Sequence, residues 1–263
     1  MAKSFALEET TIDQIHDAYR AKTLTCVELV QGYLDRIAAY DQKGPALNAF
    51  VALNADALTE AAALDAAFQQ SGKLSGPLHG IPIAVKDQAE TKGIPTSFGS
   101  IAIKGYVPKE DSTLVAKLKA AGAVILGKTT LPDFATSWFG YSSASGETKN
   151  PYDLARDPGG SSAGTGAAIA ANLAAVGIGE EPPTREELNN GRWTVLTFPT
   201  NTLIAAQTWL PSICLPAGFS SAGIPVGLEM VVLPYHEPDL FRLGYAFEQA
   251  THHRRPPAAA PPL

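Results

Sequence analysis

The sequence of 263 residues contains few cysteines and no surplus of basic residues. Its two cysteines, Cys26 and Cys214, are too few and too far apart to indicate a disulfide framework or a metal cluster. Twenty lysines and arginines stand against 26 acidic residues, and the net charge of −6 argues against nucleic acid as a partner. We therefore expect no metal, no nucleic acid and a reducing, cytoplasmic setting.

Long apolar runs are also missing. No stretch approaches the roughly 20 apolar residues that cross a membrane, and residues 1–9 lack the apolar core of a secretory signal. Hydrophobic residues make up 45% and charged residues 17% of the chain, which is an ordinary globular mixture. The length allows one or two domains with a substantial core, and it is compatible with an oligomer.

Three helices are predicted in the first part of the chain. Thr11 with Gln14, and Thr25 with Glu28, have the spacing of a capping box, so a helix should begin after each threonine. The alanine- and leucine-rich stretch 53–70 indicates a third helix, which a following Ser-Gly pair should end.

Short apolar runs at 81–85 and 123–126 predict buried strands, with Pro82 near a strand start or on an edge. Lys86 follows the first run directly. By its position alone it is read as a lysine that reaches the surface, but burial there would lower its pKa and suit it as a general base. The alternation of helices and strands indicates an α/β fold with a partly parallel sheet covered by helices.

Residues 122–129, Gly-Ala-Val-Ile-Leu-Gly-Lys-Thr, satisfy the phosphate-loop pattern. A phosphate loop follows a strand, whereas here the four central residues are themselves the predicted strand. We therefore set nucleotide binding aside as a weak alternative that an ATP titration would test.

A glycine- and serine-rich stretch at 157–166 is the most distinctive part of the chain. Glycine allows backbone conformations closed to other residues and lets another chain or a ligand approach closely. The small residues at 167–175 predict a tightly packed helix after it, which a flexible linker would not have.

Two segments of the chain resemble the amidase signature family. They are Gly-Gly-Ser-Ser-Ala-Gly at 159–164 and Gly-Ile-Pro-Ile-Ala-Val-Lys-Asp at 80–87. The resemblance extends over about 5–180 and again over 195–257. It implies a mixed sheet covered by helices and hydrolysis of the carbon–nitrogen bond of small amides, without metal or organic cofactor.

The resemblance also implies roles for individual residues. Lys86 corresponds to the catalytic lysine and Ser161 to a serine that follows a cis peptide bond and relays protons. Gly159, Gly160 and Ser162 would support the catalytic loop. Aromatic residues at 138–141 would lie near the site, although they are equally consistent with a core under a polar loop.

The nucleophile that the family pattern requires is missing. Its expected position is Arg185, and no Gly-Gly-Ser occurs after Gly164. We therefore predict a truncated, single amidase-like domain over 1–257, with an internal deletion near 180–194, that does not turn over. The alternative is a non-catalytic amidase-like fragment or binding protein.

The later part of the chain predicts three strands, a helix and a tail. The strands fall at 194–199, 211–219 and 224–232, after an earlier one at 176–179. Pro238 suits the first turn of the final helix, whose inward residues should be Leu240, Leu243, Phe247 and Ala250. Residues 258–263 are predicted to be a disordered tail.

Overall fold

The computed structural model of the chain describes residues 5–174, 211–233 and 235–263. The predicted strands at 176–179 and 194–199, and Arg185, lie outside these residues. The longer elements of the first part are α1 (Ile12–Arg20), α2 (Cys26–Tyr40), β1 (Phe50–Leu53), α3 (Ala57–Ser71), β2 (Pro82–Lys86), α4 (Thr113–Ala120), β3 (Val124–Thr129) and α5 (Ala163–Ala170). Short elements between them are η1 (Ile101–Ile103), η2 (Asp133–Ala135), β4 (Tyr141–Ser142) and β5 (Gly146–Glu147). β6 (Ser212–Phe219), β7 (Pro225–Val231) and α8 (Glu237–Thr251) follow.

Both predicted capping boxes are present at the starts of α1 and α2. The Thr11 hydroxyl accepts from the backbone N–H of Gln14 at 3.2 Å, and the Gln14 side chain accepts from the backbone N–H of Thr11 at 2.9 Å. Thr25 and Glu28 make the same reciprocal pair. Each box satisfies two N–H groups that have no partner within the helix, which is why the helices begin there.

The third predicted helix begins later than the sequence indicates. Residues 50–53 form the edge strand β1, and α3 begins only at Ala57. Its end is as predicted, because Gly72 takes a left-handed conformation with φ of 67°. Leu53, where the predicted helix starts, pairs instead with Gly127 of β3, and this tertiary pairing overrides the local helix propensity.

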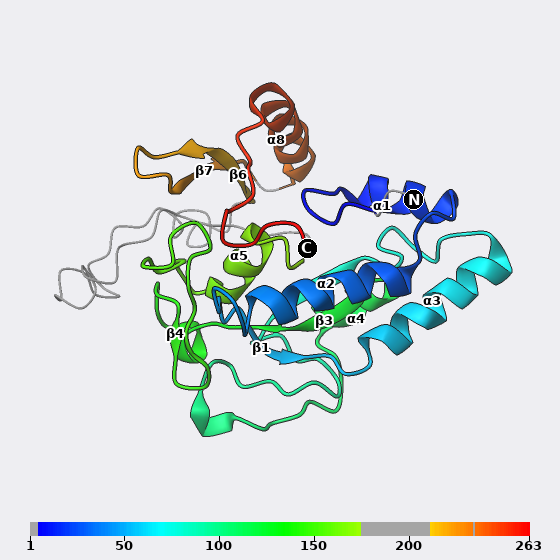
Figure 1. Cartoon of the computed structure of the whole chain (residues 1–263), viewed down its shortest axis with the longest axis horizontal. Helices are drawn as coiled ribbons and strands as arrows, with labels where there is room; N and C mark the ends of the chain where they lie inside the picture. Colours follow the sequence, from blue (N-terminus) through cyan, green and yellow to red (C-terminus); the bar gives the residue numbers. More distant parts are fainter. Residues whose placement is uncertain (1–4, 175–210, 234) are drawn as a thin grey trace.

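The central sheet has the strand order β1-β3-β2 and is mixed (Figure 1). β2 runs parallel to β3, whereas β1 is antiparallel to it. α2, α3 and α5 contact its strands, and the main hydrophobic cluster joins residues of these helices to Ile81, Val124 and Leu126. The predicted α/β class, with a partly parallel sheet covered by helices, is confirmed.

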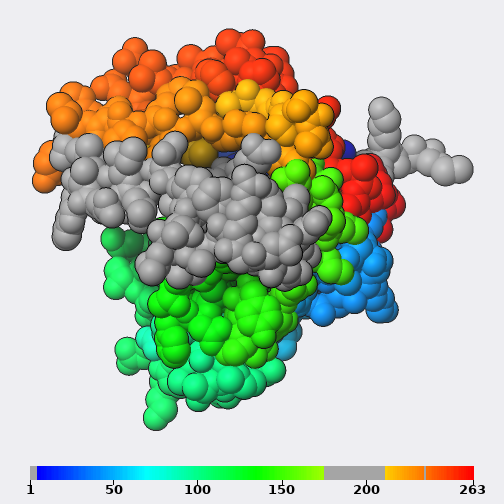
Figure 2. Space-filling model, turned by 90° about the vertical axis from the view of Figure 1, so that its left-hand side faces the viewer, coloured from blue at the N-terminus to red at the C-terminus, as the bar shows by residue number. Residues whose placement is uncertain are grey.

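The β6–β7 hairpin and α8 form a second layer beyond α5, seen at the top of Figures 1 and 2. Both predicted strands are present. Leu240 and Gly244 are the residues of α8 that are buried, whereas Leu243 and Ala250 are exposed, so the predicted inward face was too wide. Among the described elements α8 packs mainly against β6 and β7, and this two-stranded sheet covers only a narrow stripe of the helix surface.

The C-terminal segment 258–263, which its composition predicts to be a disordered tail, is mostly exposed but is anchored to the rest of the molecule at Ala260. Ala260 is 1% exposed and belongs to the main hydrophobic cluster. The buried Arg36 guanidinium donates to the carbonyl oxygens of Ala260 and Pro261 at 3.0 and 2.9 Å. It also donates to those of Ala171 and Asn172, just after α5. One buried cation thus joins the tail to the end of a core helix, a contact that composition cannot reveal.

Within the part of the chain that the structure describes, every helix is too short or too polar to span a lipid bilayer.

Candidate active site

The structure brings together Lys86, at the end of β2, and Ser161, in the glycine loop before α5. Lys86 Nζ donates to Ser161 Oγ at 2.6 Å, although 75 positions separate the two residues. Both side chains are half-buried, and burial lowers the pKa of the Lys86 amine. The peptide bond between Gly160 and Ser161 is cis. The cis bond before Ser161 that the resemblance implies is confirmed.

A bulge in β3 decides which side chains face α5. Ile83 pairs with Ile125, but Ala84 pairs with Gly127, so two residues of β3 oppose one of β2. Beyond the bulge, Lys86 pairs with Thr129. Because register partners in neighbouring strands point to the same side of a sheet, Lys86 and Thr129 share the side that α5 covers.

Lys128 therefore lies on the opposite side of the sheet, where it binds the loop that follows β2. Its Nζ donates to the carbonyl oxygen of Ala89 at 2.6 Å and to the Thr96 hydroxyl at 2.9 Å, and it lies 3.7 Å from Asp87 Oδ1. Burial lowers the pKa of Lys128 to about 8, and the Asp87 carboxylate opposes that shift. This pair anchors the residue directly after Lys86.

The phosphate-loop pattern at 122–129 is thus a strand, as predicted. Its Lys128 is fully buried and bound by the protein's own oxygen atoms, so it cannot serve a nucleotide. Neither Lys128 nor Thr129 is predicted from the sequence as a residue of the site. The signal that could have found them is a lysine inside a strand, where it needs buried partners.

α5 begins four residues before the small-residue helix that the sequence predicts, and it ends at Ala170 rather than near 175. The reason lies at Gly164, whose backbone N–H donates to the carbonyl oxygen of Thr130 at 3.0 Å. A Cβ on Gly164 would lie 2.3 Å from both Ala49 O and Thr130 N. The glycine lets the helix start directly against the sheet, and Asn172, with φ of 55°, follows its end.

The other loop residues are placed by backbone contacts. Gly159 has φ of 81° and donates to the buried Asp157 carboxylate at 2.8 Å, which also accepts from the Gly140 N–H. A Cβ on Gly160 would lie 2.9 Å from Ser137 O, so the loop passes close to the segment that carries the aromatic residues. Ser162 is exposed. Within the described residues its side chain makes no capping hydrogen bond, while its carbonyl oxygen accepts from the Gly166 N–H at 2.9 Å.

The aromatic residues beside this loop are partly accessible. Trp138 and Phe139 are half-buried, whereas Tyr141 is 60% exposed and Phe134 is 56% exposed. These aromatic side chains are therefore neither a fully buried core nor a fully exposed surface patch. The half-buried Trp138 and Phe139 are accessible enough to border a ligand.

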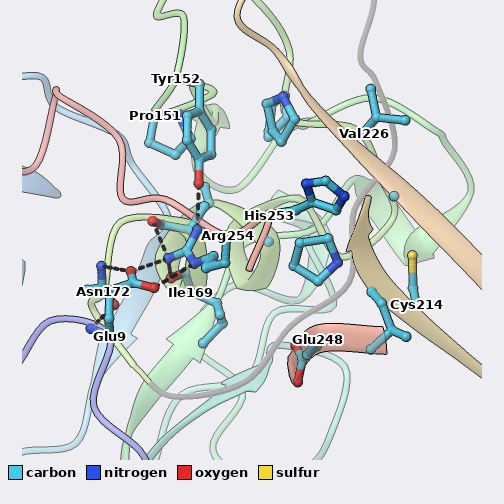
Figure 3. Close-up of a pocket in the computed structure, with 18 of the residues that line it drawn as sticks. Glu9, Pro151, Tyr152, Ile169, Asn172, Cys214, Val226, Glu248, His253 and Arg254 are labelled. Carbon is cyan, nitrogen blue, oxygen red and sulfur yellow. Dashed lines mark hydrogen bonds and ion pairs between the residues drawn. The ribbon is translucent and has the colours of Figure 1, made fainter. Parts of the chain in front are cut away.

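A cavity of about 700 Å³ lies on another side of α5, between that helix and the β6–β7 layer (Figure 3). Neither Lys86 nor Ser161 lines it, although Gly166 does. At its edge, Arg254 donates to Glu9 and to the carbonyl oxygen of Ala170 at the end of α5, where a cation is favourable. The cavity is therefore distinct from the amine–hydroxyl pair.

Within the described part of the chain, no group of three or more histidine, cysteine, aspartate or glutamate side chains is arranged to hold a metal ion. Cys26 is buried and its pKa is raised to about 12, first by burial and then by Asp65. A thiol with so high a pKa stays protonated and unreactive.

His79 has a structural role at the turn before β2. It is fully buried, and its Nδ1 accepts from the backbone N–H of Ser75 at 3.1 Å, which assigns the proton of the neutral ring to Nε2. Burial lowers the pKa of His79, and the nearby His16 lowers it further, whereas Asp65 raises it.

We expect the stability of the protein to fall in acid partly through His79. Its folded-state pKa lies below the ordinary value near 6.5, so its contribution is fully present above that pH and is lost as the pH falls toward the folded-state pKa. The largest slope from one such group is about 1.4 kcal/mol per pH unit. Urea unfolding of the parent and His79→Gln between pH 8 and 5 measures it. The variant should show a shallower slope; equal slopes for parent and His79→Gln would contradict the assignment.

The fold and this pair of side chains define an α/β protein in which a lysine at a strand end meets a serine in a glycine loop. The family model described as Amidase matches residues 28–184, which are 157 of the 263 residues. The chain therefore belongs to the amidase signature family. The match ends at residue 184, so the resemblance over 195–257 stays a prediction.

Individual relatives agree with this family. The chain is 46% identical over 176 residues to a glutamyl-tRNA(Gln) amidotransferase subunit of Alkaliphilus metalliredigens (strain QYMF), covering 66% of this chain and 35% of that protein. Native peptide amidase from Stenotrophomonas maltophilia is similar in structure, with a TM-score of 0.61 and 45% identity over 64% of this chain and 35% of that one. An amidase family protein from Bacillus anthracis str. Ames gives a TM-score of 0.60 at 34% identity, covering 64% of this chain and 34% of that one. The chain thus spans about a third of the length of the relatives it matches.

Proposed function

We propose that this chain carries the base and the relay of an amide-hydrolysing site, but does not turn over amides by itself. The observation that carries the proposal is the 2.6 Å contact between Lys86 Nζ and Ser161 Oγ. Similarity to peptide amidase and to a glutamyl-tRNA(Gln) amidotransferase supports the carbon–nitrogen bond of a small amide as the substrate class.

In the proposed chemistry Lys86 acts as a neutral amine. Burial lowers its pKa, which increases the neutral fraction near neutral pH. The amine takes the proton of Ser161, whose oxygen takes a proton from the attacking hydroxyl and later returns one to the leaving amine. Gly159, Gly160 and the main chain of Ser162, whose carbonyl oxygen accepts from the Gly166 N–H, shape the loop that presents Ser161, and the half-buried Trp138 borders the substrate.

The attacking hydroxyl is what the chain lacks, because no Gly-Gly-Ser follows Gly164 and Arg185 stands at its expected position. The second candidate function is therefore a non-catalytic protein that keeps the family's fold and binds a ligand. The cavity of about 700 Å³ beside α5 favours this candidate, because it has room for a small molecule away from Lys86.

The relay predicts a measurable coupling between the two residues. The Lys86 ammonium donates to Ser161, so Ser161→Ala should lower the pKa of Lys86 further by removing that acceptor. We expect its neutral fraction at neutral pH to rise about threefold. The measurement is the pH dependence of acetylation by trace acetic anhydride, followed for each lysine by peptide mass spectrometry.

Ser162→Ala is the matched control, since it removes a neighbouring exposed hydroxyl that makes no capping hydrogen bond in the described structure. It should leave the Lys86 profile unchanged. A parent Lys86 that titrates as an ordinary lysine and ignores Ser161→Ala would overturn the proposed relay.

A further inference from the structure

Two hydroxyl contacts join α5 and the loop residue just before it to the central sheet. The first is the contact between Ser161 and Lys86, and the second joins Thr165 Oγ1 of α5 to Thr129 Oγ1 of β3 at 2.6 Å. Lys86 and Thr129 are register partners across β2 and β3. The four side chains therefore form two parallel links between the same helix end and the same two strands.

The two links reach different strands of the sheet. Neighbouring strands lie about 4.8 Å apart, and Ser161 lies two residues before the first residue of α5 whereas Thr165 lies inside the helix. Ser161 and Thr165 are four residues apart, so each can reach its own strand only when α5 sits at one height and one rotation above the sheet. A shift of α5 that keeps one contact must stretch the other.

We propose that Thr129 and Thr165 are positioning residues, which hold α5 where Ser161 Oγ meets Lys86 Nζ. This inference rests on the proposed function of that pair. Neither threonine touches the lysine or the serine through a hydrogen bond in the described structure, so they act through the placement of the helix. The close backbone approach at Gly164, between the two links, sets the distance from the sheet, and the threonine pair sets the rotation.

The charged residues next to Lys86 and Thr129 in the sequence do not face α5. Asp87 and Lys128 pair with each other on the other side of the sheet, where the loop after β2 surrounds them. A change at Thr165 therefore alters the surroundings of Lys86 through Ser161 rather than through a neighbouring charge.

Thr165→Val in the full chain is the test, because valine keeps the shape of the side chain and removes the hydroxyl. The Lys86 acetylation profile should move toward that of Ser161→Ala, by at least half of that shift. In the Ser161→Ala background the same substitution should have no further effect, and Thr165→Ser should restore the parent profile.

Two further variants distinguish a specific effect on Lys86 from a folding defect and from the general effect of removing a buried threonine pair. The double variant Thr129→Val/Thr165→Val leaves no unpaired hydroxyl, so it should fold even if Thr165→Val alone does not, and it should show the same shift. Thr148→Val removes another buried threonine pair of 2.6 Å, with Thr130, and should leave Lys86 unchanged.

The outcomes separate this inference from the proposed function. A Lys86 profile that responds to Ser161→Ala but to neither threonine variant overturns the inference alone. An equal response to Thr165→Val with and without Ser161 also overturns it, because the effect would then bypass the serine. A profile that ignores Ser161→Ala overturns the proposed relay itself.

Discussion

We expect the purified chain to hydrolyse neither aryl nor aliphatic amides above the uncatalysed background. Losing the nucleophile of a serine hydrolase costs on the order of 10⁶ in turnover, and losing one oxyanion donor costs roughly 10²–10³. The sequence has no Gly-Gly-Ser after Gly164 to supply either group. These losses do not add, but the first alone would place turnover near background. The measurement is release of aniline from a panel of acyl anilides, with labelling by a serine-directed fluorophosphonate as a second readout.

Ser161 is the hydroxyl best placed to contradict this expectation, since it already contacts an amine. It would then have to act as nucleophile and relay together. Lys86→Ala and Ser161→Ala are the controls. Turnover or labelling that both substitutions abolish would show that the chain uses Ser161 as a nucleophile, and the proposal of an inactive relay would be wrong.

We expect Gly164→Ala to destabilise the protein by at least about 3 kcal/mol, the upper end of the usual cost of overpacking. The added Cβ would lie 2.3 Å from Ala49 O and Thr130 N, and both are backbone atoms of the sheet region that cannot rotate away. The helix must therefore move off the sheet and lose its hydrogen bond to Thr130. Urea unfolding measures the loss, and the melting temperature should fall by roughly 6–12 °C.

Gly32→Ala in α2 is the matched control, because it makes the same change inside another buried helix. There the new Cβ would meet only the end of the Leu7 side chain, at 2.6 Å, and a flexible side chain can turn aside. The better helix propensity of alanine, worth up to about 1 kcal/mol, should offset that contact. If both variants unfold at the parent's urea midpoint, the close approach at Gly164 does not limit the position of α5.

Local signals in the sequence account for much of the fold. The capping boxes at Thr11 and Thr25 place two helix starts correctly, because the partners of each cap lie three residues away. Gly72 and Pro82 likewise mark the end of α3 and the start of β2 through their own backbone preferences. Where pairing between distant segments decides the bounds of a helix or strand, local propensity predicts the wrong bounds. It predicts a start of α3 at Leu53, the last residue of β1, and too late a start for α5.

The candidate site likewise has features that the sequence predicts and features that only the tertiary structure shows. The sequence by itself determined the family and the pair of Lys86 and Ser161, because two motifs of glycine, serine and lysine are specific in combination. It also determined that the family's nucleophile motif is missing. Only the tertiary structure decided that Lys128 binds Asp87 while Thr129 binds Thr165, because a one-residue bulge between β2 and β3 assigns neighbouring side chains to opposite sides of the sheet. A bulge depends on pairing between distant strands, and no local pattern in this sequence specifies it.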